Sequence, residues 1–206
     1  MPKTLWLVLT LFSPVLFISG CEVKSAERIP GTLESTANLV RATEERQPLK
    51  LPLHDPKIVV KKAQRQLLLF SSGKVVRTYR IGLGLSPIGD KVRAGDRRTP
   101  EGEFYVFTKN DRSAFYLSLG LSYPNTTHAE RGLRDGLITR AQYDAITRAL
   151  RGKKAPPQST HLGGDIYIHG NGAQSDWTWG CVALENEDIR ELFDAVSVGT
   201  PVTIEP

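Results

Sequence analysis

The stretch that decides the fold is residues 165–184, DIYIHGNGAQSDWTWGCVAL. Its apolar start predicts a short strand that runs into His169 and Gly170, and its apolar end predicts a second strand that begins at Cys181. Cysteine catalysis needs a thiol close to an imidazole that accepts and later returns a proton. Two neighbouring strand ends can supply that pair, and Gly180 allows close approach of substrate, with backbone N–H groups there for an oxyanion. The alternative is that Cys181 is a small buried hydrophobic residue.

Outside this stretch, most of the chain has the pattern of short strands. Apolar and β-branched runs predict strands over 58–60, 66–70, 75–81, 103–108, 114–121 and 202–204, with a hairpin turn at 71–74 and a Gly-rich loop over 82–95. A helix after the Cys181 strand is predicted from the apolar face formed by Ile189, Leu192, Phe193 and Val196, with Asn186 as its cap. The sequence therefore predicts a mainly β domain of the α+β class.

Residues 128–152 interrupt the strand pattern. Thr139 and Gln142 have the spacing of a capping box, and small and apolar residues recur at helical spacing as far as Gly152. A helix is therefore predicted in this insertion. Two roles remain open from the sequence, a wall or lid over a substrate groove and a packing insertion without a catalytic role.

The N-terminus predicts export. Lys3 precedes an apolar run from Leu5 to Ile18, which is typical of a secretory signal peptide and too short for a transmembrane helix. The run ends at Ser19-Gly20-Cys21, which resembles a bacterial lipobox, so we expect a signal peptide over 1–20 and lipidation of Cys21. Ordinary cleavage near residues 25–26 is the alternative.

The expected domain organisation follows from this leader and from the composition. Residues 21–55 are polar and rich in charge and proline, as in a tether, and the catalytic domain is expected over 56–206. The two cysteines form no Cys/His cluster, so we expect no metal and no organic cofactor. The net charge of +5 suits an anionic partner, but export and scattered Lys and Arg residues argue against nucleic acid.

Three short motifs resemble the L,D-transpeptidase (YkuD-like) catalytic domain of bacterial cell-wall enzymes. They are Thr99-Pro100-Glu101-Gly102-Glu103-Phe104, Ile168-His169-Gly170 and Gly180-Cys181-Val182. The resemblance extends over about residues 57–206. It implies a β-sandwich-like fold, with Cys181 as the nucleophile and His169 as the base.

The residues around the expected nucleophile depart from the common pattern of that family. Trp179 stands where members usually have His, and Ala183 stands where a polar residue is frequent. The string Asp-Trp-Thr-Trp-Gly-Cys is similar to a subfamily that includes an amidase releasing Braun-type lipoprotein from peptidoglycan. Both departures put cross-linking activity in question, while they leave the Cys181/His169 pair intact.

The resemblance implies a cell-envelope cysteine acyltransferase that acts on peptidoglycan stem peptides through a thioester. One alternative is an L,D-carboxypeptidase or amidase that hydrolyses peptidoglycan or its lipoprotein linkage, and another is a catalytically silent wall-binding lipoprotein. An envelope lipoprotein is therefore a further possible partner. We expect the protein in the periplasm, anchored to a membrane by Cys21, and Glu22 favours the outer membrane of a Gram-negative source.

The remaining candidate residues have competing interpretations. Arg98 and Trp179 are predicted to contact substrate, and Asp176 either orients His169 or forms a turn. The other three histidines, His54, His128 and His161, are expected at the surface, with His161 held as the reserve base.

Overall fold

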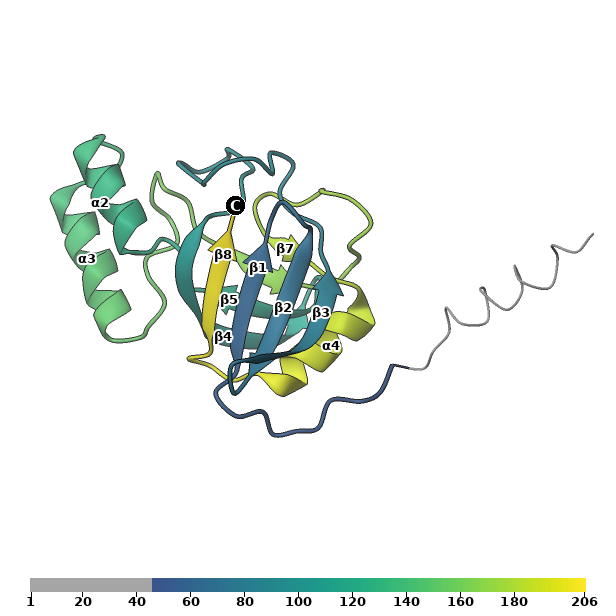
Figure 1. Cartoon of the computed structure of the whole chain (residues 1–206). Helices are drawn as coiled ribbons and strands as arrows, with labels where there is room; N and C mark the ends of the chain where they lie inside the picture. The colour runs from purple at the N-terminus through teal and green to yellow at the C-terminus, as the bar shows by residue number, and fades with distance from the viewer. Residues whose placement is uncertain (1–45) are drawn as a thin grey trace, which may run out of the picture. The chain divides into compact units, whose positions relative to one another are not determined.

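The computed structural model describes residues 46–206 (Figure 1). The predicted signal peptide, Cys21 and most of the predicted tether lie outside these described residues. Within the part of the chain that is described, no helix is long and apolar enough to cross a membrane.

One sheet of eight strands organises the domain, in the order β3-β2-β1-β8-β4-β5-β6-β7. The strands are β1 (Lys57–Lys61), β2 (Gln66–Ser71), β3 (Lys74–Arg80), β4 (Gly102–Ser113), β5 (Tyr116–Leu121), β6 (Tyr167–His169), β7 (Val182–Ala183) and β8 (Pro201–Glu205). The predicted 71–74 turn joins β2 to β3, and the predicted strand at 202–204 is β8, which pairs in parallel with β1 and antiparallel with β4.

The sheet bends back on itself because β4 belongs to both of its halves. Residues Gly102 to Tyr105 of β4 pair with β8, and the register towards β5 then shifts after Val106. An isolated bridge between Gly82, just after β3, and Ala183 of β7 joins the two outer strands of the order. The result is a mostly-sheet half-barrel, which agrees with the predicted mainly β class (Figure 1).

The core lies inside this bent sheet. Ile58 and Val60 of β1, Leu67 and Leu69 of β2, and Leu119 and Leu121 of β5 are buried, as expected from side chains that alternate across a strand. The helix α4 (Asn186–Ala195) covers the core with the buried side chains of Ile189 and Leu192. Burial of apolar area at about 25 cal/mol per Å² makes this core the main source of stability.

The first residues of α4 differ from the prediction. Glu185, not Asn186, is the N-cap residue, and its side chain makes no capping hydrogen bond. The Asn186 side chain instead accepts a hydrogen bond from the Asn171 backbone N–H, at 2.9 Å. The predicted cap is therefore wrong, because the amide group is used to hold the loop that follows His169-Gly170.

The insertion forms a helical hairpin with its own small core. Helix α3 (Arg140–Arg151) begins with the predicted capping box of Thr139 and Gln142. A preceding helix, α2 (Thr126–Arg134), was not predicted. Buried residues that join the two helices to the following loop are Ala129, Ile138, Ile146 and Leu162.

Candidate active site

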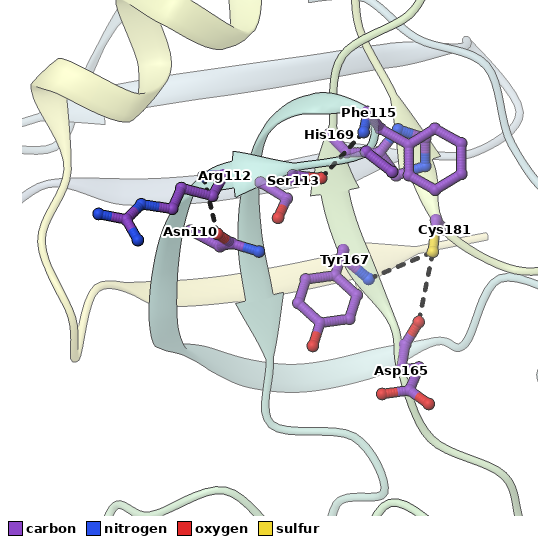
Figure 2. Close-up of a pocket in the computed structure, with 10 residues that line it drawn as sticks. Asn110, Arg112, Ser113, Phe115, Asp165, Tyr167, His169 and Cys181 are labelled. Atoms are coloured by element: carbon purple, nitrogen blue, oxygen red, sulfur yellow. Dashed lines mark hydrogen bonds between the residues drawn. The ribbon is translucent and has the colours of Figure 1, made fainter.

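His169 and Cys181 come together because β6 and β7 are parallel neighbours. Ile168 pairs with Val182, and His169 pairs with Ala183, so Cys181 lies beside Tyr167 at the start of the pairing. Side chains two residues apart on a strand share a face, which places Tyr167 and His169 on the same side of β6. Both line the same cavity as Cys181 (Figure 2).

The turn before Cys181 requires glycine. Gly180 has φ +129°, a conformation that residues with a side chain rarely adopt. A Cβ atom there would also lie 2.8 Å from the Arg98 carbonyl oxygen. Gly180 thus allows the backbone of this turn to pack directly against the segment that carries Arg98.

A buried threonine hydroxyl holds the same turn. The Thr178 hydroxyl donates a hydrogen bond to the Cys181 carbonyl oxygen at 2.7 Å and accepts one from the Gly180 N–H at 3.1 Å. The Thr178 backbone is paired as well, through its N–H to Leu83 and its carbonyl to Leu85. In this conformation the Gly180 N–H is therefore already used, which leaves the backbone N–H of Cys181 as the nearest candidate donor to an oxyanion.

The environment of His169 favours one neutral tautomer. Its Nδ1 atom lies 2.8 Å from the Gly170 carbonyl oxygen, which can only accept a hydrogen bond, so Nδ1 carries the proton and Nε2 is an acceptor. The ring is buried between Phe115 and Trp177, with ring centroids 4.7 Å and 5.5 Å away. Burial lowers the pKa of the imidazole, and the hydrogen bond to Gly170 opposes this shift only in part. His169 is thus suited to accept a proton near neutral pH.

Cys181 is a protonated thiol at rest. Its Sγ atom accepts a hydrogen bond from the Tyr167 backbone N–H and donates one to the Asp165 carbonyl oxygen, both at 3.4 Å. Burial raises the pKa of the thiol to about 11, although the Tyr167 N–H partly counteracts it. The pair therefore rests as a neutral thiol and a neutral imidazole, and the proton must move when the sulfur attacks.

Cys181 lies where two cavities meet. The first cavity, of about 300 Å³, is lined by Asn110, Arg112, Ser113, Ala114, Phe115, Ser118, Asp165, Tyr167, His169 and Cys181 (Figure 2). The second cavity, of about 380 Å³, shares Asp165 and Cys181 and is otherwise lined by Lys91, Ala94, Gly95, Gln158, Ser159, Thr160, Gly163, Gly164 and Trp179. Neither α2 nor α3 contributes a residue to these two cavities, which favours the packing role for the described hairpin.

The two predicted substrate contacts differ in their placement. Trp179 is 68% exposed, lines the second cavity and stacks under the Arg97 guanidinium, 4.8 Å from its ring centroid. Arg98 lines neither cavity, and its guanidinium donates to the Asp90 carbonyl oxygen at 3.3 Å. The structure therefore brings Trp179, but not Arg98, to the thiol.

Asp176 does not orient His169. Its carboxylate binds the Arg65 guanidinium at 2.7 Å and accepts from the Leu83 N–H at 2.9 Å. These contacts fix the loop before Trp177 to the β1–β2 turn. The residue that orients His169 is Gly170, through its carbonyl oxygen.

The other histidines lie away from the thiol. His128 is buried, against the prediction of a surface position, with its Nδ1 2.6 Å from Asn125 Oδ1 and its Nε2 3.0 Å from Asp90 Oδ1. It joins α2 to the 82–95 loop. His54 and His161 are exposed, and neither lines a cavity with Cys181.

Several site residues were not found from the sequence. Tyr167 could have been found, since it lies two residues before His169 on one strand. Phe115 and Arg112 reach the site from the β4–β5 hairpin, and no local signal in the sequence indicates this. Among residues 46–206, no group of side chains is arranged to hold a metal ion.

A thiol and an imidazole on adjacent strand ends, next to a glycine turn, define a cysteine-nucleophile site on a β-rich domain. The family model of the L,D-transpeptidase catalytic domain (YkuD) matches residues 55–204. The chain therefore belongs to this family, whose members are peptidoglycan-modifying enzymes.

Solved structures resemble this fold at low sequence identity. An L,D-transpeptidase from Xylanimonas cellulosilytica is 17% identical over 84% of this chain and 69% of its own, with a TM-score of 0.44. Bd1075 from Bdellovibrio bacteriovorus is 20% identical over 74% of this chain and 48% of its own, with a TM-score of 0.48. The helical cell shape determining protein Pgp2 from Campylobacter jejuni is 20% identical over 81% of this chain and 53% of its own, with a TM-score of 0.49. This chain thus spans about half of the latter two proteins. Comparison with curated protein sequences gives no match.

Proposed function

We propose that the protein is a cell-envelope cysteine acyltransferase that forms a thioester between Cys181 and a peptidoglycan stem peptide. The observation that carries the proposal is that Cys181 and a buried His169 line one cavity. The Nδ1 atom of His169 donates a hydrogen bond to the Gly170 carbonyl oxygen. This hydrogen bond leaves Nε2 of His169 as the proton acceptor. The family supports peptidoglycan as the polymer on which the protein acts.

The proposed reaction begins with attack of the Cys181 sulfur on the carbonyl carbon of the L-centre of the diamino acid. The thiol proton passes to Nε2 of His169 as the C–S bond forms. Collapse of the tetrahedral intermediate breaks the C–N bond, and His169 returns the proton to the departing amine. The thioester is then attacked by a second amine or by water, and the sulfur leaves as the thiol again.

The resting protonation states make His169 essential to this step. A thiol with a pKa of about 11 holds very little thiolate at neutral pH, so attack requires removal of the proton by a neighbouring base. General-base assistance contributes typically about 10²–10⁴-fold. The lowered pKa of His169 keeps its imidazole neutral and ready for this role.

Hydrolysis of the thioester is the second candidate outcome, and the residues beside the nucleophile favour it. Exposed Trp179 lines the second cavity, whereas Ala183 on β7 is fully buried, lines neither cavity and carries no polar side-chain atom. Water needs no shaped path to the thioester, whereas a bulky amine does. The substrate would then be a stem peptide that is trimmed, or a lipoprotein linkage that is released.

A catalytically silent wall-binding lipoprotein is the alternative from another class. It requires no base beside a thiol, so a cavity lined by both Cys181 and His169 has no role in it. Covalent labelling of Cys181 by a carbapenem separates the two, because only an acylating site reacts.

We further propose that the protein acts in the periplasm while anchored to a membrane through lipidated Cys21. The support is the sequence alone, namely the apolar run that ends at Ser19-Gly20-Cys21. Several acyl chains give stable anchoring, whereas one chain binds only marginally.

The reaction is tested by incubating the protein with a defined tetrapeptide donor and an excess of an amine acceptor, followed by mass spectrometry over time. We expect a covalent adduct on Cys181, and free tripeptide at least as abundant as cross-linked product. Dominance of the cross-linked product would refute the preference for water. Absence of any adduct or product would refute the acyltransferase itself.

A further inference from the structure

The wall of the second cavity contains a buried lysine. Lys91 lines this cavity together with Cys181, and its side chain is only 2% exposed. Charged side chains are rarely buried to this degree unless they are paired. The Lys91 ammonium donates hydrogen bonds to Asp96 Oδ1 at 2.8 Å and to the Arg93 carbonyl oxygen at 3.1 Å. These contacts hold a cation in the wall of a cavity that reaches the thiol.

The loop that carries Lys91 is held from two directions. Inside the loop, the Asp96 carboxylate also accepts hydrogen bonds from three backbone N–H groups, those of Val92, Arg93 and Arg98. From α2, the Arg131 guanidinium donates to the Lys91 carbonyl oxygen and to the Asp90 carboxylate. Lys91 is therefore fixed through its side chain and its backbone, as a preorganised charge must be.

Lys91 and the base lie in different cavities beside the same sulfur. His169 lines the first cavity and not the second, Lys91 lines the second and not the first, and Cys181 lines both. The thiol lies beside Tyr167, with His169 two residues further along the chain and Asp165 two residues before it (Figure 2). The imidazole and the ammonium therefore do not compete for one place at the sulfur.

Transfer of the thiol proton to His169 leaves negative charge on the sulfur, and the groups around it act on this charge in opposite directions. Burial raises the pKa of the Cys181 thiol, the Tyr167 N–H and the charge of Lys91 lower it, and the charge of Asp165 raises it. The titratable or charged side chains that line the two cavities besides Cys181 are Lys91, Arg112, Asp165, Tyr167 and His169. Among these described residues Lys91 is the one buried lysine or arginine, since Arg112 is exposed.

We propose that the Lys91 ammonium is a fixed electrostatic partner of Cys181, which stabilises the negative charge on the sulfur while the proton resides on His169. The inference deepens the proposed function and rests on it for the nature of the reaction. No bond to Lys91 forms or breaks. The proton moves from Sγ to Nε2 of His169 and then to the departing amine, and Lys91 stays protonated and paired with Asp96 throughout.

A second buried lysine provides a matched control. Lys62 is also 2% exposed, and its ammonium binds Glu101 Oε1 at 2.7 Å and the Gly89 carbonyl oxygen at 2.7 Å. Gly89 belongs to the same loop as Lys91, but Lys62 lines neither cavity with Cys181. Lys62→Met and Lys91→Met therefore each remove a buried cation that contacts this loop, and only Lys91→Met removes one beside the thiol.

The first measurement is the pH dependence of Cys181 alkylation by iodoacetamide, which requires no peptide substrate. A nearby opposite charge shifts a pKa by about 1–3, and the pairing with Asp96 weakens this effect, so we expect the thiol pKa to rise by about 0.5–1 in Lys91→Met. A thiolate of higher pKa is a better nucleophile, so the alkylation rate near neutral pH should fall only about two- to fivefold. Lys62→Met should keep the wild-type profile, even where urea denaturation shows a loss of stability.

The second measurement is acylation by the tetrapeptide donor. We expect kcat for acylation to fall about three- to tenfold in Lys91→Met, because a pKa change of about one corresponds to a tenfold change in equilibrium. KM should stay unchanged, since Lys91 acts on the sulfur and not on the bound peptide. The double variant Lys91→Met/Asp96→Asn leaves no unpaired buried carboxylate, so it serves if the single variant does not fold. It should also be slower than the wild type.

The outcomes separate this inference from the proposed function. An unchanged alkylation profile in Lys91→Met, or equal slowing in Lys62→Met, would overturn the role of Lys91. A wild-type rate in the double variant would overturn it as well, since the slowing would then come from the unpaired Asp96 carboxylate. A raised KM with unchanged kcat would assign Lys91 to substrate binding and contradict the proposal. If the wild type forms no acyl adduct while Lys91→Met shows the alkylation change, the proposed function fails and the action of Lys91 on the thiol stands.

Discussion

Thr178→Val tests whether the buried hydroxyl next to the nucleophile sets both stability and reactivity. Valine replaces the hydroxyl by a methyl group of similar size, so the packing of this 3% exposed side chain changes little. The two hydrogen bonds of the hydroxyl, to the Cys181 carbonyl and from the Gly180 N–H, are lost together. The backbone hydrogen bonds of Thr178 to Leu83 and Leu85 remain, so the variant should still fold.

The magnitude follows from the groups that are left without partners. A buried polar group that loses its hydrogen bond costs about 1–3 kcal/mol. The Gly180 N–H contact is buried, whereas the Cys181 carbonyl contact is partly buried and open to replacement by water. We therefore expect the free energy of unfolding to fall by roughly 2–4 kcal/mol, a large part of the about 5–15 kcal/mol typical of a domain.

Urea denaturation measures the change in stability, and adduct formation with the tetrapeptide donor measures acylation. Thr178→Ser is the matched control, because it keeps the hydroxyl and should lose at most about 1 kcal/mol for the missing methyl group. Acylation should slow at least tenfold in Thr178→Val and stay close to wild type in Thr178→Ser. Equal stability of the two variants would refute the reasoning, as would a wild-type rate of acylation in Thr178→Val.

Further predictions concern the two cysteines and the base. Cys181→Ala should abolish adduct formation, and His169→Ala should slow it by roughly 10²–10⁴-fold; labelling of the latter at the wild-type rate would show that another group activates the thiol. Alkylation of Cys181 by iodoacetamide should rise about tenfold per pH unit up to about pH 10, because the thiolate fraction grows until the pH reaches the raised pKa of about 11. If the alkylation rate instead reached a plateau near pH 8, the raised pKa of the Cys181 thiol would be contradicted. Cys21→Ser should release the protein from membranes with its activity unchanged, and membrane retention of the processed variant would remove the lipid anchor.

The parts of the fold and site that the sequence could predict are those with a local signal. The strand patterns and the Thr139 capping box can be recognised from residues close together in the sequence, and the structure contains both. His169 and Cys181 could be placed together because each follows or begins an apolar strand beside a glycine. Helix α2 was missed because its residues, Thr126–Arg134, are mostly polar and only Ala129 and Leu133 form an apolar pair at helical spacing.

What could not be predicted depends on residues that are distant in the sequence. Asp176 has the features of a carboxylate that orients His169, but both of its carboxylate oxygens accept hydrogen bonds from Arg65 on the β1–β2 turn. His128 has polar neighbours in the sequence, yet it is buried because Asp90 reaches it from another loop. Phe115 covers His169 only because β5, which begins directly after Phe115, pairs with the distant strand β6.

The central place of β8 has a consequence for folding during synthesis. This strand, Pro201–Glu205, lies between β1 and β4 and pairs with both. The strands on either side of it therefore stay separate until the residues of β8 have been made and paired. Pairing of segments so far apart in the sequence is slow compared with the formation of helices and hairpins. A growing or prematurely terminated chain that stops before β8 therefore lacks the strand that joins β1, β2 and β3 to the half of the sheet that carries His169 and Cys181. The two halves of the sheet thus become one continuous sheet only after the last strand of the domain has paired.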